Sequence, residues 1–124
     1  HGLIIGYANE LRQVLANLIG NALDAMNGME PRVLTIRSRP VTDWSTGRQG
    51  VRITVADTGS GMDNATQQHI FEPFFTTKSE TGTGLGLWVS EEIVSKRHGS
   101  LRARSSKAPE HRGSVFSFFL PYSE

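Results

Sequence analysis

The chain contains no cysteine, which excludes both a disulfide framework and a metal site built from thiolates. No apolar run approaches the roughly 18 residues that a membrane-spanning helix needs, and no signal peptide is visible. Charge of one sign is also scarce, because 13 Lys and Arg are balanced by 12 Asp and Glu, and the net charge is +1. Since these cations are scattered along the sequence, nothing in it suggests a nucleic-acid partner. We expect a cytoplasmic domain that does not itself enter a membrane, although its parent protein could be membrane-anchored.

The length of 124 residues fits a single domain, and we expect residues 1–124 to form one. A hydrophobic content of 37%, with six Phe and two Trp, is sufficient for a packed core. His1 has no Met before it, which indicates a fragment or a processed chain rather than a natural start.

Apolar periodicity and turn residues predict two long helices and four strands. In chain order, we expect a helix from the N-cap Asn9 to about Met26, strands at 33–39 and 51–56 joined by a turn at 40–50, a helix at 84–98 with Gly99 as its C′ residue, and strands at 101–105 and 115–120. This order predicts an α/β sandwich with helices on one side of a mixed sheet. The intervening stretch at 57–83 is too long for an ordinary connection and is typical of a lid or binding segment.

A glycine-rich segment immediately precedes the second predicted helix. Gly82, Gly84 and Gly86 alternate with Thr83 and Leu85. Without Cβ atoms this backbone can gather several N–H donors around an anion, and the start of a helix favours negative charge at the same place. The spacing is neither the dinucleotide fingerprint nor the lysine-terminated P-loop. Taken alone, the segment therefore fits either a phosphate cradle or a plain turn before a helix.

The first predicted helix carries a stripe of oxygen-bearing side chains. Asn17, Asn21 and Asp24 fall within roughly a 60° arc opposite the apolar face. Asparagine is a poor helix-interior residue, so two in mid-helix suggest a role such as a site for Mg²⁺, which prefers oxygen ligands and often shares nucleotide phosphates. The alternative is a solvated face, because Glu10 and Gln13 continue the same stripe.

A carboxylate and two glycines follow the second predicted strand. An ionised Asp57 can only accept hydrogen bonds, which suits an exocyclic amine such as that of adenine. Gly59 and Gly61 would let the backbone approach a flat ring closely. The alternative for this segment alone is an ordinary Asp-x-Gly turn.

Four segments in this order closely resemble the N, G1, F and G2 boxes of sensor histidine kinases. They are Asn17–Ala22, Asp57–Gly61, Phe71–Lys78 and Gly82–Leu87. The resemblance covers nearly the whole chain and implies the catalytic ATP-binding domain, whose Bergerat fold is shared with gyrase, Hsp90 and MutL ATPases. The expected architecture is a two-layer α/β sandwich with a mixed β-sheet, helices packed on one face, and a flexible ATP lid at about 63–83.

The resemblance also implies a set of site residues for ATP and Mg²⁺. Asn21 matches the Mg²⁺-coordinating asparagine, and Asn17 lines the phosphate end. Asp57 matches the carboxylate that binds the adenine amino group, with Gly59 and Gly61 shaping the base site. The remaining matches are the phosphate-binding backbone of Gly82, Thr83, Gly84, Leu85 and Gly86, and Lys78 as a partner for the terminal phosphate, with a solvated loop lysine as its alternative.

The phenylalanines of the third box leave two interpretations open. Phe71, Phe74 and Phe75 form an apolar cluster in an otherwise polar segment. Such a cluster fits a lid that docks and undocks, and it fits ordinary anchoring to the core equally well.

Two departures from related families bear on the activity. Gyrase-like ATPases carry a glutamate that activates water where this chain has Asn17, which cannot act as a base, so hydrolysis should be weak. Asp24 would lie near a triphosphate, where an unpaired carboxylate is unfavourable, and we expect it to pair or to point away.

The histidines fall outside the phosphoacceptor motif of the family. His69, His98 and His111 are expected to be surface residues. The resemblance therefore implies a kinase module with no catalytic residue of its own, which donates the γ-phosphoryl of ATP to a histidine on a separate dimerisation and phosphoacceptor domain and acts indirectly on a response regulator. The alternatives are an ATPase of the gyrase and MutL kind, or a degenerate module that binds nucleotide or a partner without phosphotransfer.

Overall fold

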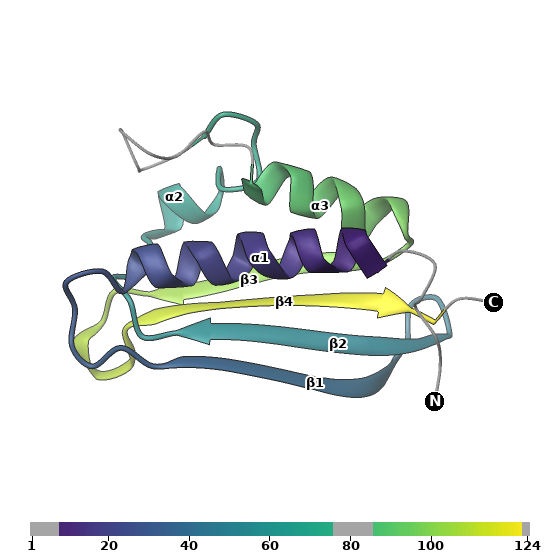
Figure 1. The fold of residues 1–124 in the computed structure, drawn as a ribbon, viewed down its shortest axis with the longest axis horizontal. Helices are drawn as coiled ribbons and strands as arrows, with labels where there is room; N and C mark the ends of the chain where they lie inside the picture. The colour runs from purple at the N-terminus through teal and green to yellow at the C-terminus, as the bar shows by residue number, and fades with distance from the viewer. Residues whose placement is uncertain (1–7, 76–85, 123–124) are drawn as a thin grey trace.

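Helices cover one face of a four-stranded sheet in the computed structural model, which describes residues 8–75 and 86–122 (Figure 1). The elements in chain order are α1 (Ala8–Ala25), β1 (Leu34–Asp43), β2 (Arg48–Asp57), α2 (Asn64–Gln67), α3 (Gly86–Lys96), β3 (Ser100–Ser106), the 3₁₀ turn η2 (Pro109–His111) and β4 (Gly113–Pro121). This arrangement confirms the predicted α/β sandwich with its helices on one side.

The sheet has the strand order β1-β2-β4-β3, so β2 and β4 are central. All three pairings are antiparallel. The parallel pairing that would make the sheet mixed, as expected from the sequence, is absent among the described residues.

The first hairpin is longer than its sequence suggests. The segment 40–50 was expected to be a turn, but β1 continues to Asp43 and β2 begins at Arg48, which leaves only four residues between them. Pro40 lies inside β1, and this is tolerated because β1 is an edge strand. Pairing with a central strand therefore overrides the weak strand propensity of this polar segment.

The start of α1 and the end of α3 both differ in detail from what the sequence predicts. Asn9 was expected to be the N-cap, yet it lies inside α1, and its Oδ1 accepts a hydrogen bond from Arg12 Nη1 at 2.8 Å. At the end of α3 the left-handed residue is His98, with φ of 66°, and not Gly99. The Gly99 amide donates to the Val94 carbonyl at 2.9 Å, which completes a Schellman motif. Gly99 is needed there because a Cβ would collide with the Phe119 carbonyl.

The core lies between the two layers. Alternate residues of β2 and β4 face the helices, as strand geometry requires. The buried apolar cluster contains Val14, Leu18, Ala22, Ile53, Val55, Ile70, Val94, Leu101, Phe116, Phe118 and Leu120. This packing fixes α1 and α3 over the central strands, and so positions the polar residues at the helix and strand ends.

Candidate functional site

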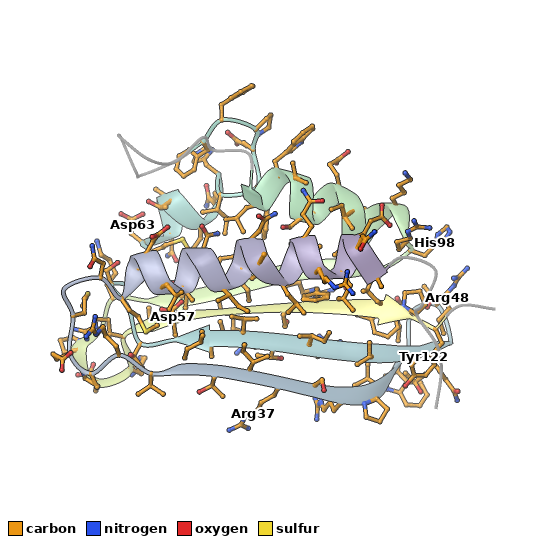
Figure 2. All side chains as sticks on the ribbon, in the orientation of Figure 1. Arg37, Arg48, Asp57, Asp63, His98 and Tyr122 are labelled. Carbon is orange, nitrogen blue, oxygen red and sulfur yellow. The ribbon has the colours of Figure 1, made fainter. Side chains whose placement is uncertain are left out.

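Asp57 ends β2 beneath the carboxyl-terminal end of α1 (Figure 2). Its side chain is on the helix face of the sheet, opposite Ser114 of β4, and the residue is only 7% exposed. Burial raises the pKa of the Asp57 carboxyl, while backbone hydrogen bonds from Gly59 and Ser114 partly oppose that effect. The Gly59 amide donates to Asp57 Oδ1 at 2.8 Å. A carboxylate so placed retains further acceptor capacity.

The glycines after Asp57 are held tightly against two other elements. A Cβ on Gly59 would lie 2.6 Å from the Ala25 carbonyl oxygen at the end of α1. The next amide, that of Ser60, donates to the same oxygen at 3.1 Å. Gly61 has φ of 74°, and a Cβ there would collide with the Ser106 carbonyl. Neither position has room for a side chain, so the loop follows the backbone of α1 and β3 closely.

This crowding predicts the effect of one added methyl group. Gly59→Ala should lower the free energy of unfolding by about 1–3 kcal/mol, because the backbone must move to relieve an overpacked contact. Gly20→Ala is the matched control, since nothing lies within 4 Å of the corresponding Cβ. In the α1 interior that change should instead raise stability by about 0.5–1 kcal/mol. Urea denaturation of both variants and the wild type checks this, and a Gly59→Ala midpoint no lower than that of the wild type would show that the Gly59 loop is not clamped.

A pair of serine hydroxyls joins the loop to the central sheet. Ser105 Oγ accepts from the Met62 amide at 2.7 Å and donates to the Gly113 carbonyl at 3.1 Å. Ser114 Oγ lies 2.8 Å from Ser105 Oγ and, given those two bonds, is the donor of the pair. The role of Ser105 was missed from the sequence, because only strand pairing places it beside Ser114.

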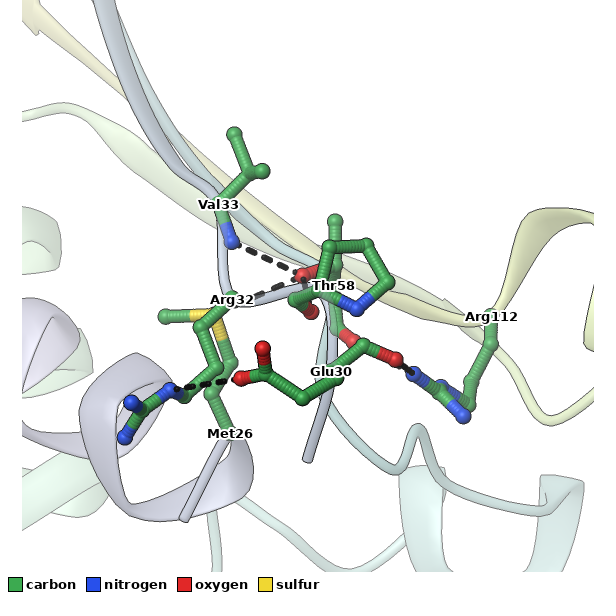
Figure 3. Close-up of polar contacts among 7 residues, drawn as sticks. Met26, Glu30, Arg32, Val33, Thr58 and Arg112 are labelled. Carbon is green, nitrogen blue, oxygen red and sulfur yellow. Dashed lines mark hydrogen bonds and ion pairs between the residues drawn. The ribbon is translucent and has the colours of Figure 1, made fainter. Parts of the chain in front are cut away.

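The residue after Asp57 organises the connection between α1 and β1 (Figure 3). Thr58 Oγ1 donates to the Pro31 carbonyl at 2.7 Å and accepts from the Val33 amide at 2.9 Å. From the other side, Arg112 Nη2 donates to the Glu30 carbonyl at 3.4 Å and to the Thr58 carbonyl at 3.3 Å. These bonds tie a long connection to the segment that carries Asp57.

Asn17 joins α1 to the start of α3. Its Nδ2 donates to the Gly86 carbonyl and to Ser90 Oγ, each at 3.1 Å. Ser90 is fully buried, so these bonds satisfy a polar group inside the helix layer. The structure therefore brings Asn17 and Gly86 together, and Asn21 lies half-buried one turn further along α1.

The structure describes only some of the other predicted site residues. Asp24 has an exposed side chain on α1. Lys78, Gly82, Thr83, Gly84 and Leu85 lie outside the described residues. Among the residues that are described, no group of three or more His, Cys, Asp or Glu could hold a metal ion.

The described part of the expected lid, residues 63–75, is attached to the core. Ile70 is 5% exposed, and Phe71 and Phe75 pack against the buried cluster. Phe74 differs, because it is 72% exposed and has φ of 67°. Core anchoring thus accounts for two of the three phenylalanines, and the remainder of the expected lid lies outside the described residues.

The three described histidines, His69, His98 and His111, are exposed, as expected for surface residues. His69 Nδ1 lies 2.7 Å from Glu72 Oε2, and its ring is tilted against that of Phe75. His98 follows α3 and His111 lies in η2.

Among the described residues, no helix is both long and apolar enough to cross a bilayer.

Comparison with known proteins identifies a family and relatives that this chain resembles. A family described as histidine kinase-, DNA gyrase B- and HSP90-like ATPase matches residues 6–124. The sensor protein TdiS of Thauera aromatica is 43% identical over 114 residues, which cover 90% of this chain and 19% of TdiS. The chain spans about a fifth of the length of such curated relatives.

Solved structures share the fold. The catalytic domain of the histidine kinase ThkA is 30% identical, with a TM-score of 0.73 over 94% of this chain and 69% of that domain structure. Full-length ShkA in complex with AMPPNP is 29% identical, with a TM-score of 0.72 over 92% of this chain and 22% of ShkA.

Proposed function

The chain belongs to the family of histidine kinase-, DNA gyrase B- and HSP90-like ATPases, and on that premise we propose that residues 1–124 are the ATP-binding catalytic domain of a two-component sensor histidine kinase. Membership of the family implies ATP binding. The observation that carries the proposal is the buried Asp57 carboxylate beside two glycines that have no room for a side chain. The curated relatives are sensor kinases, which favours this function over a gyrase-like ATPase.

Asp57 is the proposed acceptor for the adenine amino group. Its carboxylate is held by the Gly59 amide and faces the end of α1, so it is fixed in position before a ligand arrives. The adjoining backbone of Gly59 and Gly61 would form the surface against which the base lies. The serine pair of Ser105 and Ser114 supports this surface from the sheet side.

Asn21 is the proposed protein ligand of Mg²⁺. It lies on α1 between Asn17, which contacts Gly86, and Ala25, which contacts Ser60. An ion bound there would neutralise phosphate charge, and it would take most of its ligands from phosphates and water, as Mg²⁺ commonly does. The phosphate-binding backbone would come from residues 82–86, with Lys78 as a partner for the terminal phosphate.

Asn17 accounts for the expected lack of strong hydrolysis. An amide cannot abstract a proton, and the Nδ2 of Asn17 is already engaged by Gly86 and Ser90. We therefore assign the domain to holding and orienting the nucleotide in the cytoplasm. The acceptor histidine would lie on a dimerisation domain of the parent kinase, and a response regulator would receive the phosphoryl group from there.

The proposal predicts binding without turnover by the isolated domain. With radiolabelled ATP and Mg²⁺, the chain should retain nucleotide but release little phosphate and label none of its own histidines. Adding the parent's dimerisation segment should give an acid-labile phosphohistidine on that segment. Brisk phosphate release would support the ATPase alternative. Nucleotide binding without any transfer to the added segment would support the degenerate-module alternative.

A further inference from the structure

Six arginines lie on the sheet face that is turned away from the helices. Val55 and Phe118 face the core, so the alternate residues of each strand point to the opposite side. In Figure 2, Arg37 lies below β1 on this opposite side. We call five of them the arginine face: Arg37 and Arg39 of β1, Arg52 of β2, and Arg102 and Arg104 of β3. The sixth, Arg48, lies at the end of the hairpin directly opposite Asp43 and is left out of the set.

The strand register brings these residues together from distant parts of the sequence. Arg39 pairs directly with Arg52. Arg37 and Arg102 lie in one row across the sheet, linked through Thr54 and Ser117. Three strand spacings separate them, which is about 14 Å. The cations that are scattered along the sequence thus form a broad positive surface, although the net charge of the whole chain is only +1.

Little neutralises this surface within the described residues. The four strands contain only two carboxylates, Asp43 and Asp57. Asp57 faces the helices, whereas Asp43 lies on the same side as the arginines, at the end of the hairpin and directly opposite Arg48. Hydrogen bonds from Ser45 lower the pKa of Asp43, and Arg52 adds a smaller effect in the same direction. Arg37, Arg39, Arg102 and Arg104 are exposed, and no ion pair or hydrogen bond involves their guanidinium groups among the described residues.

This arrangement is costly for folding. Like charges directly opposite each other destabilise a strand pair, as with Arg39 and Arg52. Charged residues on an edge strand can prevent aggregation, but this explanation does not account for the arginine face. Such protection requires only occasional charges, and Arg52 is on a central strand. A surface on which six arginines outnumber the single carboxylate of Asp43, and which does not stabilise the fold, therefore indicates an anionic partner.

We propose that the arginine face docks on an anionic phospholipid bilayer. A guanidinium group binds phosphate through a planar fork of donors. The cations are spread over a broad sheet face, which suits a planar charged surface better than the line of contact offered by a cylindrical duplex. Trp44, in the turn that ends the β1–β2 hairpin, is 90% exposed, and tryptophan prefers the interface between water and lipid. Because the proposed ATP site is on the helix side, docking leaves that site accessible (Figure 1).

Vesicle sedimentation of the intact chain tests the proposal. Binding to phosphatidylcholine vesicles containing phosphatidylserine should exceed binding to phosphatidylcholine alone, and should fall as salt is added. The variant Arg37→Gln, Arg39→Gln, Arg104→Gln should bind roughly 100-fold more weakly, because each arginine near the charged surface contributes separately. Trp44→Ala should also weaken binding. The matched control carries Arg12→Gln, Arg32→Gln and Lys96→Gln, which remove the same charge outside the arginine face and should have little effect.

Other outcomes would overturn the lipid assignment. Equal losses in the two triple variants would mean that total charge, and not this face, drives binding. Binding to duplex DNA or to polyglutamate without binding to anionic vesicles would identify a nucleic acid or an acidic protein as the partner.

A separate measurement checks that the arginine variant is folded. Its ATP affinity should be unchanged, and its unfolding midpoint should be unchanged or higher. A loss of vesicle binding would then result from the change to the arginine face itself.

Discussion

Asp57→Asn is expected to weaken ATP binding by at least about tenfold. A hydrogen bond to a charged acceptor contributes about 1.5–3 kcal/mol, and the asparagine amide would also present donors toward the adenine amino group. Wild-type protein should bind GTP poorly, because the guanine carbonyl would face the Asp57 carboxylate. Titration calorimetry with both nucleotides measures these differences, and equal ATP and GTP affinities in the wild type would remove Asp57 from base recognition.

The same substitution should have the opposite effect on the stability of the nucleotide-free protein. Burial raises the pKa of Asp57, so the folded state binds this proton more readily than the unfolded state does. The resulting stabilisation is present below the unfolded pKa and is lost as the pH rises through the folded pKa. Asparagine does not ionise. The variant should therefore be at least as stable as wild type at neutral pH and lose that advantage on acidification, as urea denaturation across the acid range would show.

Local sequence signals were sufficient to predict most elements of the fold. Both long helices and all four strands were predicted near their observed positions, because apolar spacing encodes which face is buried. The predicted ends of these elements were wrong where contacts with distant parts of the chain determine where a strand or helix stops. Pro40 indicated a turn, but an edge strand accepts it, and the left-handed end of α3 fell at His98 because the close approach to Phe119 fixes Gly99.

Local patterns identified candidate site residues only where these are close in sequence, and the family resemblance added the distant pair Asn17 and Gly86, which the structure brings together. Asp57 and the glycines after it form one segment, and the structure shows a buried Asp57 beside glycines that pack against the backbone of α1 and β3. That this segment binds a purine stays a prediction. Ser105 and Arg112 gave no signal, because their partners come from other elements and depend on register. The arginine face escaped prediction for the same reason. Its members are spread from Arg37 to Arg104, and only strand alternation and pairing gather them.

Asn21→Ala is expected to abolish phosphotransfer to the parent's dimerisation segment. If the Asn21 side-chain oxygen binds Mg²⁺, its loss leaves the phosphates without the ion that neutralises developing charge and orients the terminal phosphoryl group. Adenosine binding should persist, because Asp57 and its loop are unaltered. The fold should also persist, since alanine is the better helix former in the interior of α1.

Asn9→Ala provides the matched control for this experiment. It makes the same change on the same helix, at an exposed position remote from the proposed nucleotide site, where the Asn9 side chain accepts a hydrogen bond from Arg12. Measuring ATP affinity with and without Mg²⁺ in both variants separates metal binding from helix stability. The Asn21 variant should lose most of the Mg²⁺-dependent affinity and the Asn9 variant should keep it. If Asn21→Ala retained full Mg²⁺ dependence and transfer, the stripe on α1 would be an ordinary polar helix face, and the magnesium ligand would have to be sought among other residues.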